Sequence, residues 1–378
     1  MKFQCEKQSL SEAIAGVSKA VTQRSNVAAL EGILFTAIGT SLTLTGYDLE
    51  MGITTRIDAK IKDEGSVVLN AKLIGDMVRR LPSDIVEIEC GETLYTSIKG
   101  GITEYSINGI PAKEYPELPA AAMPSQSGEE NKNGMLPAIA IDGPLLKEMI
   151  ETTIYAVAQD DKKPANTGEK FVLEKDKLTL VALDGFRLAI CERPVKAGRE
   201  VNIVIPAKTL NEVSKLIGDS EEAVVISASK RYVVFSLKGY IIISRLLEEA
   251  FLDYKKTINP DYCTRVEVEV KSFCDTIERA SLIITERLKN PLRITFEDQL
   301  TVRCQTELGK VLDSIDCKFE GEKMEVGFNY RYLLDALRNS GCDKVAIELT
   351  GSLSPVKVVP VEGNDFIFLV MPVRFKND

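Results

Sequence analysis

The side chains of this chain that could carry out chemistry are 56 acidic residues and eight cysteines, because the sequence contains no histidine. Without histidine, the chain lacks the commonest general base, the usual partner of a nucleophile and the commonest metal ligand. The cysteines form no Cys-x-x-Cys pair, which favours buried free thiols over a zinc site or a disulfide framework. No carboxylate pair stands out, and no phosphate-binding glycine loop is present. The sequence therefore predicts binding rather than catalysis, with no metal and no cofactor.

Lysine and arginine offer a different chemistry, the binding of phosphate. The chain has a formal charge of −9, yet the segments 71–81, 207–217 and 330–340 hold seven basic residues against three acidic ones. The basic residues are Lys72, Arg79, Arg80, Lys208, Lys215, Arg331 and Arg338. On a common side these segments would form a basic track for nucleic-acid phosphates, although such charges also suit an ordinary solvated helix face. Since no base-reading motif is present, binding would be independent of sequence.

The three basic segments belong to an internal repeat. Strand-like runs begin at Ser41, Lys177 and Gln299, and helix-like runs begin at Ala71, Ala207 and Asn329. In both cases the second copy starts 136 positions after the first, and the third starts 122 positions after the second. Two landmarks with the same offsets predict three similar domains of roughly 120 residues. We expect these domains at 1–123, 124–254 and 255–378, with a polar linker over 124–137.

Each repeat also opens with an amphipathic helix. Apolar residues spaced three or four apart form one stripe in each copy. The stripes are Leu10, Ile14, Val17 and Val21; Leu146, Met149, Ile150 and Val157; and Phe273, Ile277, Ala280 and Ile284. Two helices and several β-rich runs per repeat predict an α+β fold, with the helices packed on antiparallel sheets. No run of about 18 apolar residues and no secretory leader is visible, so we expect a cytoplasmic protein.

Four short segments complete a resemblance to a known family. They are Met1-Lys2-Phe3, Leu44-Thr45-Gly46-Tyr47-Asp48-Leu49-Glu50-Met51, Asp184-Gly185-Phe186-Arg187-Leu188-Ala189 and Val370-Met371-Pro372-Val373-Arg374. Together with the three basic repeats, they resemble the bacterial sliding clamps, the β subunits of DNA polymerase III. The resemblance covers essentially the whole chain.

This resemblance implies a DNA clamp fold of three tandem domains, assembled as a head-to-tail homodimer into a ring of six domains. Such a ring would encircle double-stranded DNA, without catalysis of its own, and would confer processivity on the replicative polymerase. The implied partners are the DNA polymerase III alpha subunit, the clamp loader, and other polymerases and repair proteins that bind through short linear peptides. No membrane partner is implied.

The resemblance also implies three sets of site residues. The DNA-binding set is Arg24, Lys72, Arg79, Arg80, Gln159 and Lys208, and the dimer interface set is Tyr105, Ile107, Leu282 and Ile283. This interface would join an edge strand around 102–107 to another near 306–315. The partner-peptide pocket comprises Leu183, Gly185, Phe186, Arg187, Leu188, Leu252, Lys256, Tyr332, Leu353, Pro355, Leu369, Val370, Met371, Pro372, Val373 and Arg374.

The chemistry of this pocket is that of an apolar cavity with a charged rim. We expect Arg187 and Arg374 to meet polar or acidic groups of a peptide. The terminal strand 366–371 should expose apolar surface at a sheet edge unless a partner covers it. Asn166 and Leu252 replace a leucine and a proline of the family, so peptide preference should differ from that of other clamps.

Two other functions remain open at this point. A repeat scaffold that binds only proteins would use the same pocket, but would show no salt-dependent retention on closed circular DNA. A carboxylate-based, magnesium-dependent hydrolase or transferase would need a compact acidic cluster, and none is visible in the sequence.

Overall fold

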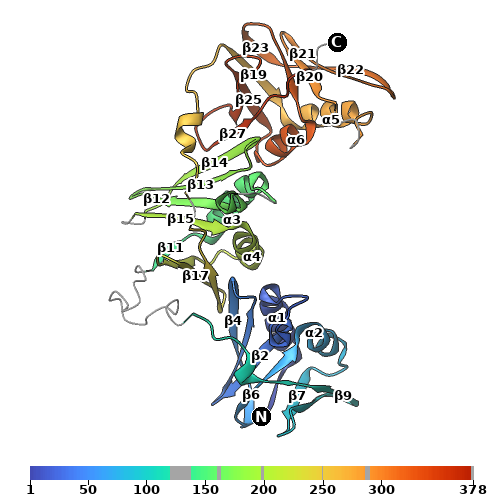
Figure 1. The fold of residues 1–378 in the computed structure, drawn as a ribbon, viewed down its shortest axis with the longest axis vertical. Helices are drawn as coiled ribbons and strands as arrows, with labels where there is room; N and C mark the ends of the chain where they lie inside the picture. The colour runs from blue at the N-terminus through green and yellow to red at the C-terminus, as the bar shows by residue number, and fades with distance from the viewer. Residues whose placement is uncertain (120–137, 160–162, 197–199, 249, 286–289, 376–378) are drawn as a thin grey trace. The chain divides into compact units, whose positions relative to one another are not determined.

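The computed structural model describes residues 1–119, 138–159, 163–196, 200–248, 250–285 and 290–375 (Figure 1). The chain divides into two compact units. Unit 1 holds residues 1–146 and 209–246, and unit 2 holds residues 147–208 and 247–378. The predicted linker at 124–137 lies outside the described residues.

Unit 1 contains two antiparallel sheets. The five-stranded sheet has the order β5 (Lys60–Asp63), β1 (Lys2–Glu6), β7 (Ile85–Cys90), β8 (Tyr95–Gly100), β9 (Thr103–Asn108). The nine-stranded sheet has the order β10 (Ile110–Pro111), β6 (Gly65–Asn70), β2 (Gly32–Ile38), β3 (Ser41–Tyr47), β4 (Met51–Asp58), β18 (Tyr240–Arg245), β17 (Tyr232–Leu237), β16 (Val224–Ala228), β11 (Ile139–Ile141). The pairing of β4 with β18 therefore makes one sheet from strands of the first and second repeats.

Unit 2 also contains two antiparallel sheets. Its nine-stranded sheet has the order β15 (Val201–Pro206), β12 (Gly168–Leu173), β13 (Lys177–Leu183), β14 (Arg187–Pro194), β27 (Phe366–Val370), β26 (Val356–Pro360), β25 (Lys344–Leu349), β19 (Thr264–Glu269), β23 (Lys318–Gly321). The four-stranded sheet has the order β22 (Gly309–Asp316), β21 (Gln299–Thr306), β20 (Leu292–Phe296), β24 (Met324–Phe328). Here the pairing of β14 with β27 joins the second and third repeats.

Six α-helices lie in the described residues: α1 (Lys7–Val17), α2 (Ala71–Arg80), α3 (Gly143–Thr153), α4 (Ala207–Ile217), α5 (Val270–Ser281) and α6 (Tyr330–Arg338). The second helices of repeats one and three start with the same side-chain cap. Asn70 Oδ1 accepts a hydrogen bond from the Leu73 amide at 3.0 Å, and Asn329 Oδ1 accepts one from the Arg331 amide at 3.1 Å. Such caps satisfy amides that the first helical turn leaves without partners.

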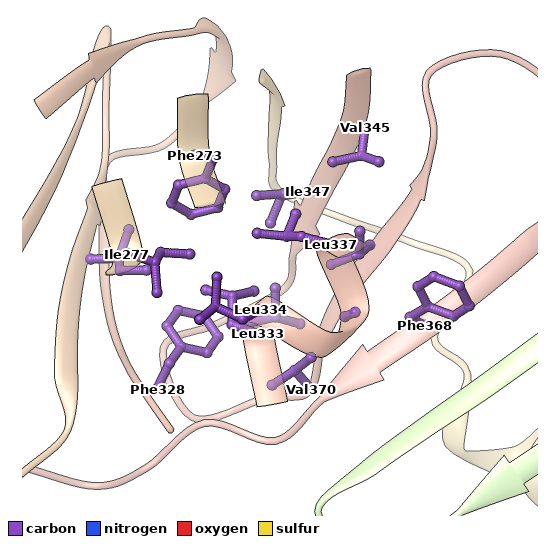
Figure 2. Close-up of a cluster of buried hydrophobic side chains, with 14 of the residues drawn as sticks. Phe273, Ile277, Phe328, Leu333, Leu334, Leu337, Val345, Ile347, Phe368 and Val370 are labelled. Carbon is purple, nitrogen blue, oxygen red and sulfur yellow. The ribbon is translucent and has the colours of Figure 1, made fainter. Parts of the chain in front are cut away.

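The core of unit 2 shows why the helical stripes are apolar. In Figure 2, side chains of α5 and α6 converge on side chains of β24, β25 and β27. The labelled residues are Phe273, Ile277, Phe328, Leu333, Leu334, Leu337, Val345, Ile347, Phe368 and Val370, and all are buried. Burial of each such side chain stabilises the fold by about 1.5–3 kcal/mol relative to exposure.

The predicted α+β class, with two helices in each of three repeats, is confirmed. The first helices are shorter than predicted, because Val21, Val157 and Ile284 lie beyond the ends of α1, α3 and α5. A 3₁₀ turn follows α1 at Ser18–Ala20 and α3 at Ile154–Ala156, which ends the 3.6-residue period. All eight cysteines are free, and five of them are buried as predicted: Cys5, Cys90, Cys191, Cys274 and Cys304.

Candidate functional site

A basic hollow lies between two helices of unit 1. Helices α1 and α2 run side by side (Figure 1). Residues of both helices line a hollow of about 740 Å³. Its basic lining residues are Lys19, Lys72 and Arg79, against one acidic residue, Glu31, and polar groups come from Ser11, Ser18, Thr22, Gln23 and Asn70. Ammonium, guanidinium, hydroxyl and amide donors in one hollow suit a phosphate oxygen.

The basic charge of the second helices is smaller than the sequence count suggests. Arg79 pairs with Asp76 at 2.5 Å, and Lys215 pairs with Glu212 at 2.8 Å. Arg338 of α6 forms an ion pair with Glu278 of α5. A count of charges along a helix misses such partners, because i,i+3 neighbours and adjacent helices supply the neutralising carboxylates.

Other predicted DNA-binding residues are exposed. Arg24, Lys72 and Arg80 have no ion pair in the part of the chain that the structure describes. Gln159 and Lys208 are also exposed. The structure brings Lys72 and Arg79 together in the hollow, and Lys19, which is outside the predicted DNA-binding set, lines it as well.

An exposed apolar surface around Phe186 in unit 2 carries part of the predicted peptide pocket. The Phe186 ring is 59% exposed and stacks on the Tyr332 ring, with centroids 5.9 Å apart. The other exposed apolar members of the predicted set are Leu252, Leu353, Met371 and Val373. Exposed apolar groups of this size are typical of surfaces that bind another molecule.

Other members of the predicted pocket are buried. Leu183, Leu188 and Leu369 belong to one buried cluster, which also contains Tyr254 from the connection between repeats two and three. Val370 is completely buried. The expectation of an exposed apolar edge at 366–371 is wrong, because β27 lies inside the nine-stranded sheet and pairs with both β14 and β26. Only Met371 and the residues after it emerge from this core.

Arg187, which we expected to meet a polar or acidic group of a peptide, is already paired within unit 2. Its Nε donates to Asp184 Oδ2 at 3.1 Å, and its Nη1 forms a hydrogen bond with Asp335 Oδ2 of α6. The guanidinium also lies over Tyr332, 4.8 Å from the ring centroid. Since two carboxylates hold Arg187, it fixes the aromatic surface in position, whereas Arg374 remains exposed.

A second hollow adjoins the end of this surface. It has a volume of about 540 Å³ and is lined by Ile284, Thr285, Asn290, Pro291, Phe328, Asn329, Tyr330, Arg331 and Val373. Of these, only Val373 was predicted. The sequence signal for the others was weak, because Asn329 reads as a helix cap and Phe328 as strand core, and both roles are also present.

Within the described ranges, no three His, Cys, Asp or Glu side chains converge where they could hold a metal ion. None of the helices in the described part of the chain has the length and apolar character needed to cross a membrane.

Family models match the chain in three consecutive stretches. The N-terminal domain of the DNA polymerase III beta subunit matches residues 1–119, the central domain matches 140–253 and the C-terminal domain matches 256–374. The chain belongs to the DNA polymerase III beta subunit family.

Relatives of this chain align with it over essentially their full lengths. The beta sliding clamp of Bacillus subtilis is 32% identical, and the alignment covers 99% of this chain and all of the relative. The solved structure of the Bacillus subtilis DNA polymerase sliding clamp superposes with a TM-score of 0.93 at 31% identity, with 100% of both chains covered. A putative DNA polymerase III beta subunit from Eubacterium rectale has a TM-score of 0.92 at 32% identity, with 99% of both chains covered.

The strand pairs that join repeats in this beta subunit share one register. Each such pair is called a seam below. Strands β4, β14 and β22 are equivalent, because they follow the repeated strands β3, β13 and β21. Strands β18, β27 and β9 are likewise equivalent, since Ser244, Val370 and Ile107 pair with Val233, Val356 and Thr96, each the first buried residue of its strand.

In both seams, the first residue of the strand that comes earlier in the sequence lies opposite an equivalent residue of the later strand. Met51 lies opposite Ser244 in the first seam, and Arg187 lies opposite Val370 in the second. The third strand equivalent to β4 and β14 is β22, and the third strand equivalent to β18 and β27 is β9. Both β22 and β9 lie at the end of their sheets. The predicted interface residues Tyr105 and Ile107 lie on β9, whereas Leu282 and Ile283 follow the end of α5. Leu282 is 82% exposed, but Ile283 packs partly on the core of unit 2.

Proposed function

We infer that this chain is a DNA sliding clamp, a processivity subunit without catalysis of its own. As a homodimeric ring it encircles double-stranded DNA and tethers DNA polymerase III to its template. The clamp family and the clamp relatives support this function over a protein-only scaffold or a hydrolase. A ring needs little affinity for any one phosphate, because topology retains it on DNA while exchangeable, salt-sensitive contacts let it slide.

The single observation that carries the ring is the shared register of the two seams. If β22 of one copy meets β9 of the next in the same register, Gly309 lies opposite Ile107, Val311 opposite Tyr105 and Asp313 opposite Thr103. In this register the half-buried faces of the two strands coincide. Burial alternates along both strands, and Val311 and Tyr105 are both half-buried. Pairing two open edges also removes a template for aggregation.

Exposed apolar side chains beside both edges support this pairing. Ile102, in the turn before β9, is fully exposed, and Leu308, before β22, is also exposed. Leu312 on β22 and Leu282 after α5 add to this surface. We propose that Tyr105, Ile107, Leu282 and Ile283 lie in the dimer interface, with Val311 and Leu312 as further members.

We propose that Arg24, Lys72, Arg79, Arg80, Gln159 and Lys208 contact DNA. Lys72 would supply charge within the α1–α2 hollow, whereas Lys19 would contribute less, because Glu212 pairs with it at 3.5 Å. Arg79 would contribute less than Lys72, because Asp76 neutralises it.

We propose that partner peptides bind the apolar surface of Phe186, Tyr332, Met371 and Val373 and extend into the 540 Å³ hollow. The partners would be the polymerase alpha subunit, the clamp loader, and other polymerases and repair proteins. Leu183, Leu188, Leu369 and Val370 would form the floor, with Gly185, Leu252, Lys256, Leu353, Pro355, Pro372 and Arg374 around it. We further propose domain limits at 1–123, 124–254 and 255–378, and a cytoplasmic location.

The test of the proposed function is retention on DNA of different topology. The clamp is loaded onto a nicked circular plasmid with the clamp loader of the same organism, and free protein is removed by gel filtration. We expect the clamp to stay on the circle and to leave after a restriction enzyme linearises it. Equal retention on circular and linear DNA would rule out encirclement, and retention on neither would favour the protein-only scaffold.

A further inference from the structure

The segment that leaves the core after β27 is held at two points of unit 2. The Met371 amide donates a hydrogen bond to the Phe186 carbonyl at 2.8 Å. Pro372 has no amide hydrogen, and the Val373 amide donates to the Gly327 carbonyl at 2.8 Å. Since Phe186 directly precedes β14 and Gly327 lies on β24, residues 371–373 connect the two sheets of this unit.

Gly327 is required for this connection. A Cβ atom at this position would lie 2.5 Å from the Val373 carbonyl oxygen and 2.8 Å from Cε1 of the Phe375 ring. Real side chains do not tolerate a backbone contact this short, so only glycine lets the terminal segment lie against β24.

Phe375 closes the segment at its end. Its ring lies under the Arg293 guanidinium, with the Arg293 carbon 4.2 Å from the ring centroid. Arg293 belongs to β20, which pairs with β24 along its length, so its position is set by the sheet. A guanidinium over an aromatic face at this distance is an attractive contact that a purely aliphatic side chain cannot replace.

We propose that Phe375, Arg293 and Gly327 form a C-terminal latch that positions Met371 and Val373 for peptide binding. The latch rests on the proposed function, because its effect is on the pocket to which Met371 and Val373 belong. Phe375 acts through the backbone of the segment, which makes it a positioning residue rather than a contact. Without the latch, the segment would have to be ordered when a peptide binds, and that cost would weaken binding.

Two readouts on the full-length protein test the latch. Hydrogen exchange, followed by mass spectrometry of the C-terminal peptide, reports the protection of the Val373 amide. Binding of the polymerase alpha subunit from the same organism, immobilised on a sensor surface, reports affinity. We expect Phe375→Leu to speed exchange and to weaken binding about three- to tenfold, mainly through faster dissociation. Phe375→Trp keeps the aromatic face and should restore both.

Variants of Arg293 and Gly327 test the same latch independently. Arg293→Met should weaken binding as Phe375→Leu does, and adding Phe375→Leu to Arg293→Met should weaken it no further, because both remove the contact between the ring and the guanidinium. Arg293→Met also removes the ion pair with Glu325, so Glu325→Gln is its control and should bind normally. Gly327→Ala should release the segment. Gly91→Ala is the matched glycine control, because the Cβ atom added there would lie 3.9 Å from the Tyr95 carbonyl oxygen, an ordinary van der Waals contact.

The outcomes separate the latch from the pocket. Faster exchange with normal binding, or weaker binding with unchanged exchange, overturns the positioning role of Phe375. Weak binding by Met371→Ala together with normal binding by Phe375→Leu would contradict the proposed latch and still support the proposed peptide pocket. Normal binding by Met371→Ala places the peptide site elsewhere and contradicts both proposals.

Discussion

Glu169 on β12 is a fully buried carboxyl group. Thr153 Oγ1 lies 3.2 Å from its Oε1, and its Oε2 has no hydrogen-bond partner among the described residues. Burial raises the pKa of Glu169 well above its usual range, and the Thr153 hydrogen bond offsets only part of this. A neutral carboxylic acid is therefore the form that the folded protein prefers.

This preference predicts a pH-dependent loss of stability. Above the unfolded pKa of about 4.3, the unfolded chain releases the Glu169 proton while the fold retains it, so stability falls as pH rises towards the folded pKa. Glu169→Gln should flatten this decline in melting temperature between pH 5 and pH 8. Glu221→Gln, at an exposed position, is the control and should follow the parent protein. Parallel pH curves for parent and Glu169→Gln would contradict a buried neutral acid.

The repeat makes the register of a strand pair between two copies predictable. Tyr105→Cys combined with Val311→Cys should give a covalent dimer on oxidation, because directly opposed residues lie within disulfide reach. Ile107→Cys combined with Val311→Cys is shifted by two residues and should not, since diagonal neighbours are about 7–8 Å apart. Non-reducing gels measure both.

The single variants control for the native thiols, of which Cys263 is exposed. A covalent dimer from the shifted pair alone would mean that the register between copies differs from the register of the β4–β18 and β14–β27 seams. No covalent dimer from either pair would argue against pairing of β9 with β22.

For the whole molecule, the formal charge of −9 and the basic hollow predict weak binding to linear DNA and strong retention on circles. The double variant Lys72→Ala and Arg80→Ala should bind a linear duplex less tightly, with a salt slope shallower by about one to two. Fluorescence anisotropy over a salt series measures this slope. Lys113→Ala, at an exposed lysine outside the proposed set, should leave it unchanged.

The same double variant should still remain on a closed circle after loading, because topology rather than affinity retains the ring. If it leaves the circle as quickly as it leaves the linear duplex, contacts with phosphate hold the clamp, and encirclement is not the mechanism.

The sequence by itself determined the local elements and the number of repeats. Strands β3, β13 and β21 begin at the predicted Ser41, Lys177 and Gln299, and α2 and α4 begin at the predicted Ala71 and Ala207. These elements depend on apolar periodicity and capping residues, which are local properties of the chain. The family could also be identified from the four short segments, because they resemble the family's segments and follow one another in the expected order.

The tertiary structure decided which of the predicted site residues are free to act. Arg187 is held by Asp335, 148 positions away, and β27 lies between β14 and β26 rather than at an edge. The contact of Phe375 with Arg293 joins the chain end to β20 in the same way. Ion pairs, strand neighbours and ring contacts of this kind depend on which distant segments meet, and no local pattern of residues encodes that meeting.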